Sequence, residues 1–124
     1  MTPLNRSDLH TAIGGISADT WTPLAETLYE AGLYFEGKAS FFNAGVTYTS
    51  PITDWCQKSY IIVITDGLST QDRNPVLTTI GNNGDTDGDG VDPGTYPDDG
   101  SDYLDDVAKY LYDIDLRADL DDKQ

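Results

Sequence analysis

Basic residues are scarce in this chain, which has 7 Lys plus Arg against 22 Asp plus Glu and a formal net charge of −15. The acidic excess is concentrated late in the sequence, because residues 85–124 hold 14 acids and 3 bases. A surface of this charge repels nucleic acid and anionic lipid and attracts cations. The composition therefore excludes nucleic acid as a partner and favours a cation-binding protein.

Long apolar segments are absent as well. No run approaches the roughly 20 apolar residues that span a bilayer, so we expect no membrane insertion. Residues 1–8 lack the basic and apolar segments of a signal peptide. Either the protein stays inside the cell, or this chain is a piece of a longer protein.

Cysteine and histidine occur once each. Cys56 cannot form an internal disulfide, so we interpret it as a partly buried free thiol, with a partner outside this chain as the alternative. His10 has no serine-rich elbow or second base near it in the sequence, and no catalytic set is recognisable. We therefore expect a protein that is not an enzyme.

The most apolar stretch, residues 59–67, reads SYIIVITDG. Four consecutive β-branched residues follow a tyrosine, a pattern typical of a strand buried on both faces within a parallel sheet. Asp66 falls at the carboxyl end of this predicted strand, where open α/β sheets place their ligand sites.

Three other parts of the sequence have helical patterns. We expect one helix to end near Ile13, where Gly14 and Gly15 follow. A second should begin with Thr22 as its cap, place Pro23 at the first helical position and end near Gly37. Its apolar stripe consists of Leu24, Leu28, Ala31 and Phe35.

A third helix is expected over residues 101–111. We expect Ser101 to cap it, and its buried face should consist of Leu104, Val107, Ala108 and Leu111. Residues 38–58 are expected to form a loop or an irregular hairpin.

A cluster of acids lies within the long connection over residues 67–100. Asp85, Asp87 and Asp89 alternate, and Gly90 follows at the sixth position, which is the D-x-D-x-D-G opening of a calcium loop. In this frame the carbonyl of Val91 occupies the seventh position. The twelfth position, where a bidentate acid is expected, is Tyr96. A later acid must therefore close the shell, and the candidates are Asp92, Asp98 and Asp99. The alternative is a solvated acidic linker without a metal.

Three stretches resemble a known family. TPLAETL at 22–28, CQKSYIIVITDG at 56–67 and SDYLDDVAKYL at 101–111, in this order, are similar to the von Willebrand factor A domain of the PilY family. That family comprises adhesins and biogenesis factors at the tip of bacterial type IV pili. The resemblance implies an α/β, Rossmann-like fold, with a parallel sheet between helices and a metal-ion-dependent adhesion site at the strand ends. In the family pattern Thr22 and Asp66 belong to that site, and their oxygens suit Mg²⁺ or Ca²⁺. Taken alone, Thr22 would be a helix cap and Asp66 part of a turn.

The sequence departs from this family at its ends. The D-x-S-x-S motif of the first strand is absent, and so are the strands expected before Ser7 and after Leu120. We therefore expect residues 1–124 to form a single partial von Willebrand A-like domain, with an acidic calcium-loop insertion at about residues 72–100. The adhesion site cannot be completed from this chain alone.

These features together predict a noncatalytic, cation-dependent adhesion module at the tip of a type IV pilus, exposed outside the cell as part of a longer secreted protein. The expected cofactors are Ca²⁺ at the acidic loop and Mg²⁺ or Ca²⁺ at the incomplete adhesion site. The expected partners are pilus components or ligands on a host surface, and unpaired sheet edges would also allow self-association. The alternative is a purely structural, calcium-stabilised fragment or linker without a ligand site.

Overall fold

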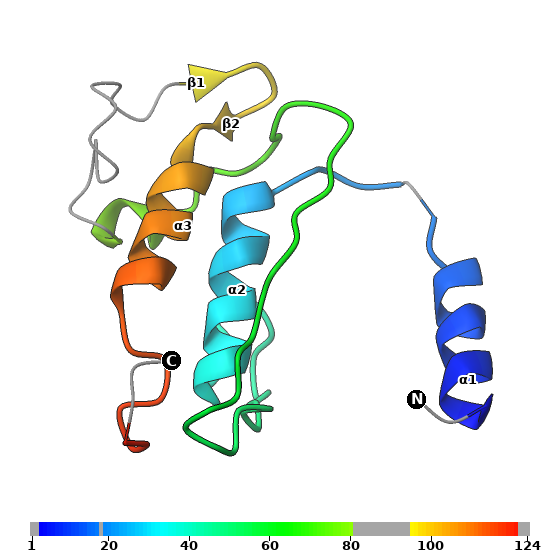
Figure 1. Ribbon diagram of the computed structural model, residues 1–124. Coiled ribbons are helices and arrows are strands. Elements are labelled where there is room, and N and C mark those ends of the chain that lie inside the picture. The colour runs from blue at the N-terminus through cyan, green and yellow to red at the C-terminus, as the bar shows by residue number, and fades with distance from the viewer. Residues whose placement is uncertain (1–2, 18, 81–94, 122–124) are drawn as a thin grey trace.

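The computed structural model describes residues 3–17, 19–80 and 95–121. Over these residues the protein is a small, mainly helical domain with almost no strand. Its elements are α1 (Pro3–Gly14), α2 (Leu24–Glu36), the 3₁₀ helix η1 (Leu77–Thr79), β1 (Thr95–Tyr96), β2 (Gly100–Ser101) and α3 (Tyr103–Asp113). Helices α2 and α3 pack side by side, whereas α1 lies apart from them (Figure 1). No helix in the described ranges is long and apolar enough to cross a membrane.

The core lies between α2, α3 and η1. Its buried members are Ala25, Leu28, Leu77, Ile80 and Val107. Tyrosines from both helices cover its margin. Residues from three separate parts of the chain meet here, so the short helices are stabilised by their shared apolar faces rather than by length.

Helix α2 has almost the bounds that the sequence predicts. Gly37 ends it in the left-handed conformation at φ 73°, and the N–H of Lys38 donates to the carbonyl of Leu33 at 3.0 Å, as in a Schellman motif. Glu30 of this helix binds the loop that follows. The Glu30 carboxylate accepts hydrogen bonds from Ser40 Oγ, from the N–H of Phe41 at 3.1 Å and from Tyr48 Oη at 2.6 Å. These bonds fix the loop after α2, where the isolated bridge between Ala39 and Thr47 confirms an irregular hairpin.

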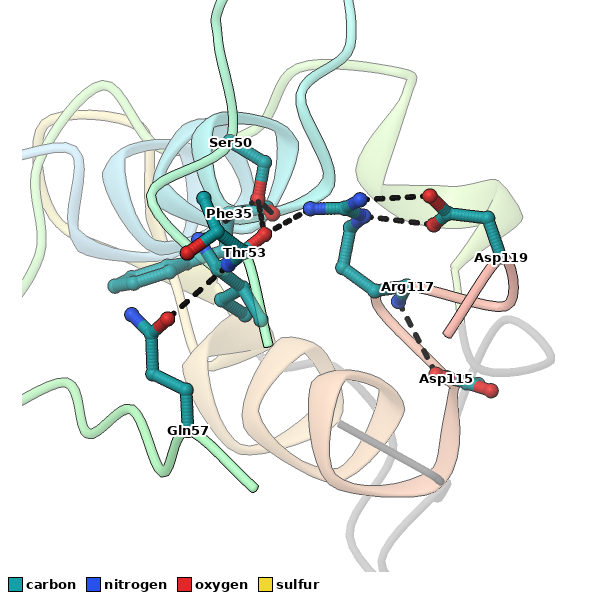
Figure 2. A network of polar contacts seen from close by, with 8 residues as sticks. Phe35, Ser50, Thr53, Gln57, Asp115, Arg117 and Asp119 are labelled. Atoms are coloured by element: carbon teal, nitrogen blue, oxygen red, sulfur yellow. Dashed lines mark hydrogen bonds and ion pairs between the residues drawn. The ribbon is translucent and has the colours of Figure 1, made fainter. Parts of the chain in front are cut away.

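The segment after α3 is tied back to the loop after α2 (Figure 2). The guanidinium of Arg117 donates to the carbonyl of Ile52, and it also binds both carboxylate oxygens of Asp119 at 2.6 and 2.7 Å. Nearby, Ser50 Oγ donates to the carbonyl of Phe35 at the end of α2. The chain on both sides of buried Ile52 is thereby fixed against the ends of the two packed helices.

The stretch predicted as a buried strand is exposed instead. Residues 59–65 run as an extended chain along α2 (Figure 1), but they pair with no other strand in the described part of the molecule. The exposed fractions alternate along the segment: Tyr60 83%, Ile61 42%, Ile62 82%, Val63 45% and Ile64 89%. The period of two is that of a strand. The prediction of burial on both faces is wrong, because α2 and α3 lie toward one face only and leave Ile61 and Val63 on that face about half exposed. A parallel sheet is accordingly not seen in these residues.

Three smaller predictions also need correction. Ser101 belongs to β2, and Asp102 is the residue that precedes α3. Ala108 is exposed, although Val107 beside it is fully buried. Cys56 is an exposed thiol rather than a partly buried one, and its sulfur lies 3.5 Å from Asp54 Oδ1.

Candidate functional site

The N-terminus of α2 is capped by a side chain from a distant part of the chain. Asp72 Oδ2 accepts a hydrogen bond from the N–H of Ala25, and Oδ1 accepts one from the N–H of Glu26, both at 2.9 Å. The first N–H groups of a helix lack partners within it and form the positive end of its dipole, so a carboxylate satisfies both needs. Pro23, at the cap position, makes no side-chain cap bond. Asp72 therefore has the role that the sequence assigned to Thr22.

Thr22 is instead joined to Thr70. The N–H of Thr22 donates to Thr70 Oγ1 at 2.8 Å, and the N–H of Thr70 donates to the carbonyl of Thr22 at 3.0 Å. This exchange holds Thr22 against Thr70, which is four residues after Asp66. The prediction that Thr22 caps α2 is wrong.

The segment 69–72 connects three elements through buried polar groups. Ser69 Oγ donates to the carbonyl of Ser101, the N–H of Ser101 donates back to Ser69 Oγ at 3.0 Å, and Ser101 Oγ donates to the carbonyl of Asp72 at 2.6 Å. The N–H of Asp72 also donates to the carbonyl of Asp99 at 2.9 Å. The same four residues thus contact the start of α2, the β1–β2 hairpin and the approach to α3.

Two carboxylates lie close together at this point. Burial raises the pKa of Asp72, although the N–H groups of Ala25 and Glu26 oppose the effect. Burial also raises the pKa of Glu26, the hydrogen bond from the N–H of Asn74 lowers it, and the negative charge of Asp72 raises it further. The Asn74 bond, at 3.0 Å to Glu26 Oε1, fixes the second carboxylate in place.

A surface hollow of about 400 Å³ opens beside this pair. Its lining residues are Glu26, Gln71, Arg73, Asn74 and Asp99. Asp99 is already engaged there, because its carboxylate accepts a hydrogen bond from Gln71 Nε2 at 3.2 Å and lies 3.9 Å from Arg73 Nη1. The hollow therefore contains both acidic and basic side chains, and Asp99 and Arg73 partly neutralise each other.

The predicted calcium ligands fall into two groups. Asp85, Asp87, Asp89, Val91 and Asp92 lie outside the described residues. Asp98 and Asp99 form the turn between β1 and β2, with φ of 57° and 55°, which is the left-handed conformation that a type I′ turn requires at both central positions. Aspartate tolerates this conformation better than most residues.

The predicted adhesion-site residues are only partly brought together. Asp66 is exposed in a bend, next to a local turn in which the N–H of Gly67 donates to Thr65 Oγ1 at 3.3 Å. Thr22 and Asp66 share no hydrogen bond. Among residues 3–17, 19–80 and 95–121, no three His, Cys, Asp or Glu side chains are grouped so as to hold a metal ion.

The residues that organise this region were not recognised from the sequence. Asp72, Ser69 and Thr70 sit in a polar stretch, STQDRN at 69–74, that is indistinguishable from an ordinary turn. The only local indication was the presence of Ser, Thr and Asp, which cap helices readily. Nothing in the spacing connects Asp72 with Ala25, which is 47 positions away.

Comparisons of the chain with protein-family models, with curated proteins and with solved structures find no match. The resemblance to the PilY von Willebrand A domain therefore stays a prediction that depends on the three sequence stretches alone.

Replacing Asp72 by Ala should lower the free energy of unfolding by about 2–3 kcal/mol, since two buried N–H groups lose a charged acceptor. Urea denaturation followed by circular dichroism measures this change. Asp19→Ala removes an exposed aspartate outside the network and should change stability by less than about 0.5 kcal/mol. Equal effects of the two substitutions would contradict the capping role.

The stability that depends on Asp72 should vary with pH. A carboxyl group whose pKa is raised by folding makes the folded state lose stability as the pH rises from the unfolded value, about 3.9, through the raised value. The stability difference between the parent and Asp72→Asn should therefore be greatest near pH 3.5 and decline toward neutral pH. A difference that grows with pH would mean that the N–H donors outweigh burial.

Proposed function

We propose that this protein is a noncatalytic, cation-dependent binding module, in which Ca²⁺ orders the acidic loop. The observation that carries the proposal is the register of Asp85, Asp87 and Asp89 with Gly90. A hard cation needs several oxygen ligands at close range, and alternate carboxylates converge when a glycine allows the backbone to turn. The charge of −15 further supports cation binding, because an ion relieves the mutual repulsion of the acids.

The ends of the loop are anchored in a way that favours this function. Ile80 is 5% exposed and belongs to the core, and Ser101 in β2 is buried in the network with Ser69. A loop whose ends are already fixed loses less conformational entropy when it closes around an ion. Of the later acids, Asp98 suits the closing position better than Asp99, because the carboxylate of Asp99 already binds Gln71 and Arg73.

A second cation site at Thr22 and Asp66 is part of the same proposal. Asp66 is exposed at the end of the extended segment, and Thr70 holds Thr22 near the chain that follows it. In a complete von Willebrand A-like domain, additional strands beside residues 59–65 would form the parallel sheet, and a D-x-S-x-S motif would complete the metal shell. A divalent ion there would bridge to an acidic group of a surface ligand or pilus component, outside the cell.

The alternative is a structural, calcium-stabilised fragment without a ligand site. The polar network around Asp72 favours it, since all of these groups serve to join elements of the fold.

Titration calorimetry with Ca²⁺ tests the loop. The metal-free chain should bind Ca²⁺, with a Kd on the order of 0.1–1 mM if the loop behaves as an extracellular module. Asp87→Ala and Asp89→Ala should each weaken binding severely, because each removes a charged ligand. The matched control is Asp121→Ala, which removes an exposed acid elsewhere. Absence of Ca²⁺ binding by the parent chain contradicts the proposal.

Asp66 distinguishes the binding module from the structural fragment. Asp66→Ala should leave the free energy of unfolding within about 0.5 kcal/mol of the parent, because the side chain is exposed. It should abolish any binding of Mg²⁺ that persists when the loop is saturated with Ca²⁺. A loss of stability, with no second ion bound by the parent, would favour the structural alternative.

A further inference from the structure

The extended segment has unused backbone hydrogen-bonding groups. No backbone-to-backbone hydrogen bond involves residues 58–66 in the part of the chain that the structure describes. Extended chain with free N–H and C=O groups is a template for pairing with another strand. Its β-branched composition is the one most compatible with a sheet.

One face of the segment is turned toward the protein's own helices, which cover it only in part. Ser59, Ile61 and Val63 line a hollow of about 620 Å³ together with α2, α3 and Leu116, and Tyr60 borders the same hollow. The α2 and α3 residues of this lining are Leu28, Gly32, Phe35, Ala108, Leu111 and Tyr112. The other face carries Tyr60, Ile62 and Ile64, each more than 80% exposed. Three adjacent large apolar side chains in water are unusual for a surface that has no partner.

The sequence of that exposed face is complementary to itself in the antiparallel direction. Lys58, Tyr60, Ile62, Ile64 and Asp66 occupy alternate positions in the sequence and begin and end with opposite charges, with Asp66 in the bend that ends the extended chain. An antiparallel pair centred on Ile62 places Lys58 opposite Asp66 of a second copy, Tyr60 opposite Ile64, and Ile62 opposite itself. Opposite charges and aromatic–aliphatic pairs are the cross-strand contacts that stabilise antiparallel ladders. A parallel pair in register would place Lys58 against Lys58 and Asp66 against Asp66.

We propose that the protein forms a twofold-symmetric dimer through antiparallel pairing of residues 58–66, centred on Ile62. The partner is a second copy, because the register that joins the apolar residues also joins Lys58 to Asp66 at both ends. An isologous pair of this kind closes on itself and gives a dimer rather than a filament. A strand has two edges, so this inference neither requires nor excludes further strands on the other edge, and it does not depend on cation binding at the acidic loop.

The acidic surface opposes the dimer and gives it a salt dependence. Each copy has a net charge of −15, so two copies repel each other over a distance that salt shortens to about 8 Å at physiological ionic strength. Association should therefore be stronger at physiological salt than at low salt. Measurements of the dimer belong at the higher ionic strength.

Cysteine cross-linking tests the register. Cys56 is exposed and is the sole thiol, so Cys56→Ser provides a cysteine-free background. In it, Ile62→Cys should form an intermolecular disulfide under mild oxidation, because the two copies of residue 62 face each other within disulfide range. Ile64→Cys is the matched control, since that residue is equally exposed but lies about 14 Å from its own copy. Cross-linking of both variants, or of neither, overturns the proposal.

Sedimentation equilibrium of the full chain tests the interaction itself. Ile62→Lys places two ammonium groups together at the symmetry axis and should raise the dimer Kd about tenfold or more. Leu68→Lys, at an exposed apolar residue outside the paired segment, should not. Circular dichroism reports whether both variants keep the parent's helices.

Charge reversal gives an independent test of the pairing between Lys58 and Asp66 of the second copy. Lys58→Asp and Asp66→Lys should each weaken the dimer, whereas the double variant restores opposite charges at both ends and should recover most of the affinity. A parent chain that stays monomeric at high protein concentration, or a dimer unaffected by these changes, overturns the proposal.

Discussion

The bond between the Asp72 carboxylate and the first N–H groups of α2 is the contact on which most of the described structure depends. The same residue receives a hydrogen bond from Ser101 at its carbonyl and donates one to the carbonyl of Asp99. The apolar core beside it is small. In such a domain, a fully satisfied buried network does much of the work of fixing the elements relative to one another, because each group that lost its partner would be left buried and unpaired.

The elements that the sequence predicted well are those with a local cause. The glycine at the end of α2 and the acids near the start of α3 act within a few residues, so the bounds of these helices followed from the pattern to within about two residues. Of the predicted apolar stripe of α2 only Leu28 is buried, because the packing against η1 and α3 covers Ala25, Gly32 and Leu33 instead. The identity of the residue that caps α2 did not follow from the pattern, because Asp72 is 47 positions from Ala25 and no periodicity connects them. Long-range polar contacts are determined by the tertiary arrangement, which a single sequence does not display.

The extended segment, residues 59–65, shows the same difference between local properties and those set by the tertiary arrangement. Its β-branched run and its period of two are local properties, and the alternating exposure of Ile61 and Ile62 reflects them. Burial is a property of the neighbours, and the strands that would provide it are not found in the described residues. For the candidate site, the acidic register over residues 85–90 is a local pattern that the sequence displays, and the calcium site that it indicates stays a prediction. The pairing of Thr22 with Thr70 rather than with Asp66 could not.

The distance in sequence between α2 and its cap has a consequence for synthesis on the ribosome. Asp72 is added 46 residues after Glu26, which at about 5–20 residues per second is a delay of roughly 2–9 seconds. During that interval the 13-residue helix has neither its capping carboxylate nor the η1 and α3 residues that cover its apolar face, and an isolated helix of this length is marginal in water. The growing chain thus exposes an unsupported helix until the residues of η1 and α3 have been translated.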